Sequence, residues 1–155
     1  MLGFFKMKKT LRYLINNNKD DDIAITSDNS KPLKFSELKK HVYNISSQLS
    51  GNGVLKTDRA AIVLPNGPEM ATAFLAVSSY MSAAPLNPSY KLSEYEFYLE
   101  DLKPKIVIVE KDSSNPVVAA ANKLGIEICE IKRNEAAPAG IFNLYNSTKS
   151  FELSD

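Results

Sequence analysis

The stretch APLNPSY, residues 84–90, decides how the middle of this chain folds. It follows a long apolar segment, and its two prolines enclose a Leu-Asn pair. Pro88 disfavours helical geometry at Asn87, so the chain has to run extended through that residue before it turns. Pro85 has no N–H group to donate to a neighbouring strand, which favours a place near a sheet edge for the short strand 83–86. The stretch therefore predicts one crossover of a parallel α/β sheet.

The same alternation of strand and helix continues on both sides of this stretch. Four short apolar runs are typical of strands covered on both faces, and three segments with helical spacing of apolar residues separate them. The predicted strands are 60–64, 83–86, 105–109 and 126–130. The predicted helices are 68–82, a segment that opens with a Ser93–Glu96 capping pattern, and 116–124. This β-α-β-α-β-α-β order predicts an α/β fold: a parallel sheet with right-handed crossovers and helices on both faces.

The proline-bearing strand also predicts the arrangement of the strands in space. Because a strand with proline belongs at an edge, we expect the order 83–86, 60–64, 105–109, 126–130. Residues 132–155 are polar and show no clear period, so an irregular tail is expected there. The whole chain, 1–155, is predicted to be a single domain, which suits its length.

A helix over 8–16 and a small β-hairpin of 23–26 with 32–35 are expected to precede the sheet. The next helix carries its apolar residues on one face and stops at the GNG run, 51–53. That face consists of Leu38, Val42, Ile45 and Leu49. His41 is assigned to the opposite, polar face and is predicted to be exposed rather than catalytic.

Composition excludes several classes of protein. Hydrophobic residues make up 44% of the 155 residues and the formal net charge is +1, which argues against a dedicated nucleic-acid surface. The single cysteine, Cys129, rules out an intrachain disulfide and a cysteine-based metal site, and it fits a reducing compartment. The N-terminal run MLGFFKMKK (1–9) is too short for a secretory core, and no segment is long enough to span a membrane. A cytoplasmic protein without nucleic-acid or membrane partners is therefore expected.

No catalytic, cofactor-binding or metal-binding residue is predicted from the sequence. The GNG run follows a helix and precedes a strand, which is the wrong order for a dinucleotide fingerprint. The run NSTKS (146–150) lacks the glycines that let backbone N–H groups close around a phosphate. The three carboxylates of Asp20 to Asp22 have no paired ligand spacing after them and are expected to be solvated. There is no Ser/His/Asp set and no paired acid and base at recognisable spacing.

Several pieces of the sequence, in order, resemble the N-terminal part of the acyl-adenylate-forming enzymes, which include acyl-CoA synthetases, 4-coumarate–CoA ligases and luciferases. The most telling pieces are DRAAIVLPNGPEM (58–70), FLAV (74–77), APLNPSY (84–90) and EFYLEDLKPKIVIV (96–109). Looser similarity extends back to FSEL (35–38) and forward to about Ile131, which is roughly two thirds of the chain. The AAPLN spelling followed by EFYL is most similar to the oxalate–CoA ligase branch. Met81-Ser82 stand where the family usually has a glycine.

The resemblance implies a parent enzyme that joins a carboxylic acid to AMP and then to CoA, with ATP, Mg²⁺ and CoA as its cofactors. The family's phosphate loop, adenine motif, magnesium-binding glutamate and catalytic lysine are all expected beyond Asp155. No functional residue of the family is therefore carried onto a position here, and no cofactor is expected to bind this chain alone. The chain is interpreted as the N-terminal subdomain of a longer ligase, inactive by itself.

Other hypotheses remain open. The chain could be a stand-alone α/β module that binds a nucleotide or a protein, or one subunit of a split enzyme. The helix 68–82 indicates that the chain packs against a further polypeptide, because its apolar residues wrap around more of its circumference than one sheet covers. We therefore expect either the remainder of a ligase chain or self-association, with this helix or a sheet edge at the contact.

Overall fold

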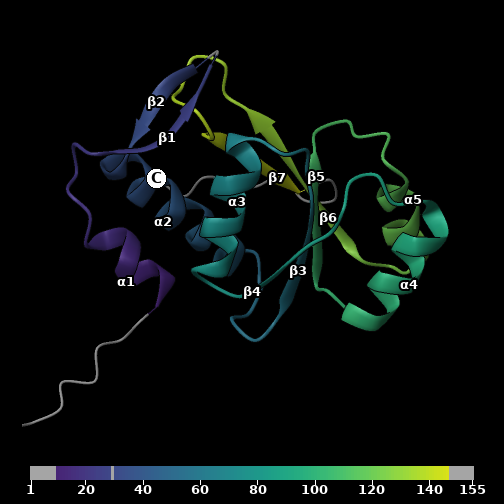
Figure 1. Cartoon of the computed structure of the whole chain (residues 1–155). Helices are drawn as coiled ribbons and strands as arrows, with labels where there is room; N and C mark the ends of the chain where they lie inside the picture. Colours follow the sequence, from purple (N-terminus) through teal and green to yellow (C-terminus); the bar gives the residue numbers. More distant parts are fainter. Residues whose placement is uncertain (1–9, 29, 147–155) are drawn as a thin grey trace, which may run out of the picture.

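The described part of the chain, residues 10–28 and 30–146 of a computed structural model, is built around a five-stranded sheet (Figure 1). Its strands lie in the order β4-β3-β5-β6-β7. Four of them run parallel: β3 (Arg59–Val63), β4 (Ser82–Pro85), β5 (Ile106–Glu110) and β6 (Glu127–Arg133). The fifth, β7 (Phe142–Asn146), is antiparallel to β6 and lies at the far edge. The predicted parallel sheet and the order of its four strands are confirmed.

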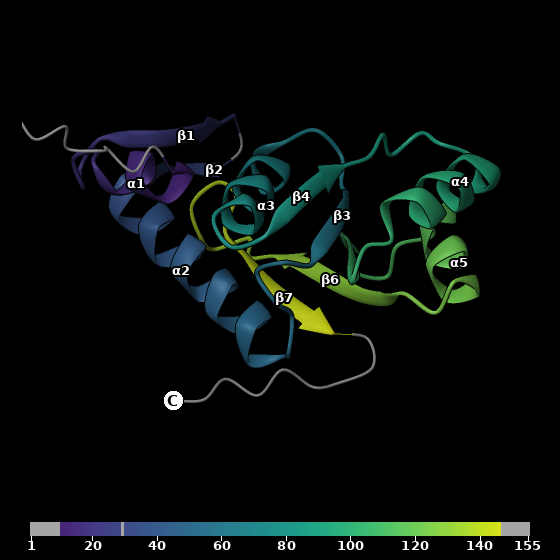
Figure 2. The same cartoon turned by 90° about the horizontal axis from the view of Figure 1, so that it is seen from below.

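The alternation of side chains along the strands explains why helices cover both faces. In β3, Ala60 and Ile62 belong to one buried cluster, whereas Ala61 and Val63 belong to another. Strands with aliphatic residues buried on both sides need a helical layer on each face. One layer consists of α2 (Phe35–Gly51) and α3 (Pro68–Ser78), and the other of α4 (Leu92–Leu102) and α5 (Pro116–Lys123). Figure 2 shows the sheet between these two layers.

The prediction of an irregular tail over 132–155 was wrong for its first part. Strand β6 continues to Arg133, and β7 pairs with it along five residues, from Cys129↔Asn146 to Arg133↔Phe142. Along β7, buried and exposed residues alternate, with Phe142 and Leu144 packed into the core. This period of two is that of a strand with one covered face. Residues 147–155 lie outside the described part of the chain.

The helix and hairpin expected in front of the sheet are present. Helix α1 (Leu11–Asn16) begins at Thr10, whose hydroxyl accepts a hydrogen bond from the Tyr13 N–H at 3.2 Å. Strands β1 (Ile23–Ser27) and β2 (Ser30–Lys34) pair antiparallel. The hairpin touches the loop that joins β6 to β7, where the Ala139 N–H donates to the Lys31 carbonyl at 2.9 Å.

The predicted exposure of His41 was wrong. This side chain on α2 is 6% exposed, and it lies among the predicted apolar residues of that helix, all of which are buried. Its ring meets the Phe142 ring of β7 edge to face, with 4.5 Å between ring centroids and 87° between planes. Strand β7, which was not predicted, therefore covers His41, which the sequence pattern had assigned to the exposed face of α2.

Helix α3 is covered on more sides than its sequence predicts. Both the sheet and α2 pack against it, so that Ala73, Ala76 and Val77 are buried. Ala71 and Phe74 remain exposed, Phe74 by 39%. The bare apolar surface of this helix is therefore smaller than its composition suggests.

The loop from Asn134 to Ile141 crosses the first turns of α3 in close contact. Gly140 has φ +81°, and a Cβ atom there would lie 2.7 Å from both the Pro68 carbonyl oxygen and Thr72 Cγ2. The Thr72 hydroxyl, which is buried, donates a hydrogen bond to the Gly140 carbonyl at 2.5 Å. Only glycine fits this backbone conformation and this separation without strain.

Helix α4 begins slightly before its predicted start. Helix α4 begins at Leu92, and the carboxylate of Glu94 accepts a hydrogen bond from the Lys91 N–H at 2.8 Å, so the predicted Ser93–Glu96 pattern is displaced by two residues. Glu37 serves α2 in the same way, accepting from the Lys34 N–H at 2.9 Å. None of the helices in the described residues has the length and apolar character needed to cross a membrane.

Candidate functional site

The connectivity of the sheet marks one place where a ligand would be expected. From β3 the chain passes to β4 on one side, and from β4 it returns to β5 on the other side of β3. The loops that follow β3 and β5 therefore diverge at their carboxyl ends. In open parallel sheets, such a switch point is where ligands bind.

A crevice of about 430 Å³ lies beside this switch point, at the carboxyl ends of β5 and β6. We call it the carboxyl-edge crevice. It is lined by Glu69, Glu110, Lys111, Ile131, Lys132, Arg133 and Glu135. None of these residues is predicted from the sequence to bind a ligand or to react. The signal that could have found Glu110 and Lys111 is their position directly after a predicted strand.

The charges in the carboxyl-edge crevice largely compensate one another. Three carboxylates face three cationic side chains, and the Arg133 Nε atom lies 3.5 Å from Glu69 Oε1. Arg133 also donates a hydrogen bond to the Ser30 hydroxyl, which ties the end of β6 to the hairpin. The ammonium of Lys111 lies 5.5 Å from the centre of the Tyr145 ring. This arrangement joins elements of the fold and leaves no concentrated positive charge for a polyphosphate.

The start of α3, at the end of β3, does not form a phosphate site either. A helix N-terminus attracts anions through its free N–H groups, but here Glu69 already places a carboxylate in the first turn. The GNG run acts as predicted, as a helix stop, with Gly53 at φ +79°. The NSTKS run begins with Asn146, the last residue of β7, and its other four residues lie outside the described part of the chain.

No nucleophile or metal site emerges among the described residues. Burial, followed by the nearby carboxylate of Glu127, raises the pKa of the Cys129 thiol to about 12, which makes a thiolate inaccessible at neutral pH. Burial lowers the pKa of His41 to about 4. Within residues 10–28 and 30–146, no three His, Cys, Asp or Glu side chains gather where they could hold a metal ion.

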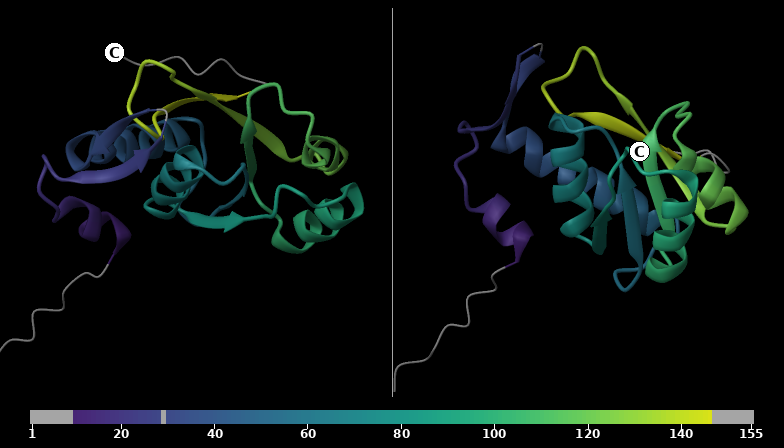
Figure 3. Two further views of the ribbon diagram at one scale, coloured as in Figure 1. Left: turned by 45° about the horizontal axis from the view of Figure 1, so that its top comes forward. Right: turned by 45° about the vertical axis from the view of Figure 1, so that its right-hand side comes forward.

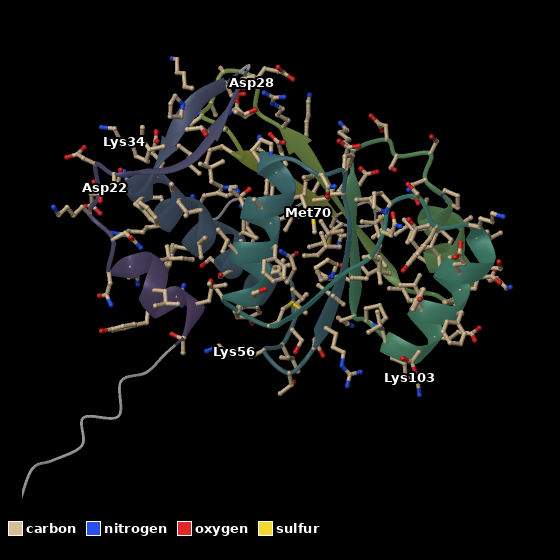
Figure 4. The ribbon with its side chains drawn as sticks, in the orientation of Figure 1. Asp22, Asp28, Lys34, Lys56, Met70 and Lys103 are labelled. Atoms are coloured by element: carbon tan, nitrogen blue, oxygen red, sulfur yellow. The ribbon has the colours of Figure 1, made fainter. Side chains whose placement is uncertain are left out.

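A second hollow, of about 420 Å³, lies at the opposite edge of the sheet. It is bordered by the ends of α4 and α5, by Lys103 and Lys105 before β5, and by Glu127, the first residue of β6. Figure 4 shows Lys56, which precedes β3, and Lys103, which precedes β5, well apart from each other but both in the lower part of the view, below Met70. This amino edge is not where parallel sheets usually bind ligands.

The loop that contains Asn87 and Pro88 is held at the carboxyl edge by side chains from the next two helices. The Tyr95 hydroxyl donates to the Asn87 carbonyl at 2.8 Å, and the Asn115 amide donates to the Pro88 carbonyl at 2.8 Å. Asn115 also begins α5, because its side-chain oxygen accepts from the Val117 N–H at 3.0 Å. The extended run that the prolines predict is thus fixed by two hydrogen bonds to consecutive carbonyls.

Comparisons with known proteins agree with this fold. The family model described as AMP-binding enzyme matches residues 14–149. An oxalate–CoA ligase of Saccharomyces cerevisiae is 40% identical over 93 residues, and one of Arabidopsis thaliana is 39% identical over 82 residues. These matches cover 57% and 52% of this chain but 17% and 16% of the two relatives. The crystal structure of MatB from Rhodopseudomonas palustris superposes with a TM-score of 0.69 at 24% identity, covering 79% of this chain and 25% of MatB.

The match of the family model extends over most of the chain and includes α2, the whole sheet and both helical layers. It also joins the pieces of sequence that carry the resemblance to acyl-adenylate-forming enzymes. The chain spans about one sixth of the length of these two oxalate–CoA ligases. The chain belongs to the AMP-binding enzyme family.

Proposed function

We propose that this chain is the N-terminal subdomain of an AMP-forming acid–CoA ligase and that it does not catalyse the reaction by itself. The observation that carries the proposal is the family match over residues 14–149 combined with the small share of each relative that the chain spans. The parent enzyme would use ATP with Mg²⁺, attach AMP to a carboxylic acid and transfer the acyl group to CoA. Among acids, oxalate is our first candidate, because two relatives at about 40% identity are named oxalate–CoA ligases.

The described residues do not fit ATP or its magnesium ion. The helix that follows β3 has the carboxylate of Glu69 in its first turn, and the carboxyl-edge crevice contains three carboxylates and three cations, of which Arg133 lies against Glu69. No group of potential metal ligands occurs in the same part of the chain. Catalysis in phosphoryl and adenylyl transfer depends on preorganised donors around the phosphates. We assign this subdomain a scaffold role, and we place the groups that hold ATP outside the described residues.

The first experiment measures pyrophosphate release by the purified 155-residue chain with ATP, Mg²⁺ and oxalate. We expect no release above a blank without protein, since residues 10–28 and 30–146 offer no site that fits the phosphates of ATP. A longer ligase of the same family, assayed in parallel, shows that the assay detects the reaction. Acid-dependent release by the short chain would overturn its assignment as an inactive subdomain.

The second experiment reads the DNA that follows the codon for Asp155. If the frame continues into a Ser/Thr/Gly-rich phosphate loop, the longer chain is expressed, and we expect it to release pyrophosphate in an acid-dependent manner. A stop codon with no ligase frame nearby would contradict the subdomain assignment and favour a stand-alone α/β module. A separate chain that co-purifies and restores activity would instead identify a split enzyme.

The natural partner in this proposal is the remainder of a ligase chain, and a cytoplasmic location accompanies it. Self-association of the isolated chain through α3 was expected from sequence. That expectation depended on a large exposed apolar surface on α3. In the structure, α2 and the sheet cover most of this helix, and only Ala71 and Phe74 of its apolar residues are classed as exposed. A different surface of the chain offers more exposed aromatic area.

A further inference from the structure

Helix α4 and the turn that precedes it carry a contiguous group of aromatic rings. Phe97 is 66% exposed, the largest exposed fraction among the large hydrophobic side chains of the described residues. Its ring contacts the Tyr98 ring edge to face at 5.4 Å between centroids. The Tyr98 ring stacks on Tyr90 at 5.1 Å with 14° between planes. Tyr98 thus joins Phe97 to Tyr90, so the three rings form one patch, and apolar patches of this kind mark interaction surfaces.

Acidic residues surround the most exposed of these rings. Glu94 precedes Phe97 by three positions, whereas Glu100 and Asp101 follow it by three and four, so all three lie on the same side of the helix. All three are exposed, and none forms an ion pair within residues 10–28 and 30–146. We call this surface, made of Tyr90, Phe97, Tyr98, Glu94, Glu100 and Asp101, the acidic aromatic face.

The chemistry of the acidic aromatic face selects the kind of segment that binds it. The same face of a second copy would bring carboxylates against carboxylates, which opposes symmetric pairing of α4 with α4. A suitable segment needs aromatic or aliphatic side chains together with cations. Residues 1–9, MLGFFKMKK, have this composition: five apolar side chains at Met1, Leu2, Phe4, Phe5 and Met7, three lysines, and no acidic residue.

The position of α1 decides whether this segment comes from the same chain or from another. Residues 1–9 precede α1, and α1 lies at the opposite end of the molecule from α4 in every view (Figures 1 and 3). Nine extended residues span at most about 30 Å. A second copy can bring its N-terminal segment to the face without crossing the body of the molecule.

We propose that the acidic aromatic face of α4 binds residues 1–9 of a second copy of this chain. Phe4 or Phe5 packs against Phe97, and the lysines of the segment lie beside Glu94, Glu100 and Asp101. The contact is heterologous: each copy uses α4 to receive one segment and offers its own segment to a neighbour. The interaction weakens in salt, because its charges are exposed.

The test measures association of the full chain by sedimentation and light scattering at micromolar concentration. Phe97→Ser is expected to raise the dissociation constant about tenfold, and so is a shift from ~0.05 M to ~0.5 M salt. The matched control is Phe74→Ser, which alters an exposed phenylalanine on α3 and is expected to leave association unchanged. Circular dichroism confirms that each variant is folded. A monomeric wild-type chain, or association weakened only by Phe74→Ser, would overturn the proposal.

Charge reversal identifies the two surfaces directly. Glu100→Lys with Asp101→Lys weakens association, and Lys8→Glu with Lys9→Glu weakens it as well. A chain that carries all four substitutions recovers association, because the opposite charges face each other again across the contact. If the fourfold variant associates no better than either double variant, residues 1–9 do not bind this face, and the proposal is wrong.

Discussion

Replacing Gly140 by alanine tests the close contact between the loop that joins β6 to β7 and helix α3. The added methyl group would meet two obstacles, the Pro68 carbonyl oxygen and Thr72 Cγ2, each at 2.7 Å. The first obstacle is backbone in the first turn of α3, so it cannot rotate away. The residue also keeps φ +81°, which an L-residue with a side chain adopts only at a cost.

The expected loss of stability has three parts. The left-handed conformation costs an alanine about 1–2 kcal/mol. Relief of the contact requires the loop to move away from α3, and this breaks the hydrogen bond of Thr72 to the Gly140 carbonyl, a net loss of about 1 kcal/mol. Residual crowding adds about 1 kcal/mol or more, as overpacking does in cores. We therefore expect Gly140→Ala to lower the free energy of unfolding by about 3–4 kcal/mol.

The measurement is urea unfolding of the full chain, followed by circular dichroism. Gly125→Ala is the matched control, because Gly125 has φ +67° and a Cβ atom there would have no other atom within 4 Å. The control isolates the conformational cost of about 1–2 kcal/mol. Adding Thr72→Ser to Gly140→Ala removes Cγ2, keeps the hydroxyl and is expected to recover part of the loss. If both glycine variants lose the same stability within ~0.5 kcal/mol, the close contact contributes nothing and the reasoning fails.

Further predictions concern buried and hydrogen-bonded groups. Burial lowers the pKa of His41 to about 4, so its contribution to stability is present above pH 6.5 and is lost as the pH falls towards 4. The difference in unfolding free energy between the wild type and His41→Leu should therefore change by ~3 kcal/mol between these two pH values. An unchanged difference would contradict this prediction. Tyr95→Phe should cost about 1 kcal/mol and Asn115→Ala about 1–2 kcal/mol. Combined, these two changes should couple by at least ~0.5 kcal/mol, because they hold one loop, whereas strict additivity would show that the loop is fixed otherwise. Cys129 should react with a thiol reagent at pH 8 only after unfolding, and fast reaction of the folded chain would disprove its burial.

The central sheet was predictable because its signals are local and agree with one another. Each apolar run has the length of a strand, and Pro85 marks the edge strand on its own. For β7, the signal was present but weak: Phe142 and Leu144 alternate with polar residues after a glycine, within a segment whose asparagines favour loops. Pairing with β6 across the loop 134–141 makes this segment a strand, and strand propensity alone does not reveal that pairing.

The burial of His41 could have been found from its spacing. It lies three residues after Leu38 and four before Ile45, both on the predicted apolar face, so helical geometry places it beside them. The carboxyl-edge crevice is a different case. The contact of Arg133 with Glu69 joins residues far apart in the chain, and no local pattern reveals that these charges neutralise each other.

The reversed direction of β7 determines where any following segment departs. Strands β3 to β6 end at the carboxyl edge, but Asn146 pairs with Cys129 near the start of β6 and donates a hydrogen bond to Glu127. The polypeptide therefore leaves the sheet at its amino edge. A segment that contributes groups to the carboxyl-edge crevice has to travel back along the height of the sheet, about 17 Å for five extended residues. This return path sets a minimum length for the connection between the scaffold and any catalytic loop that serves the same edge.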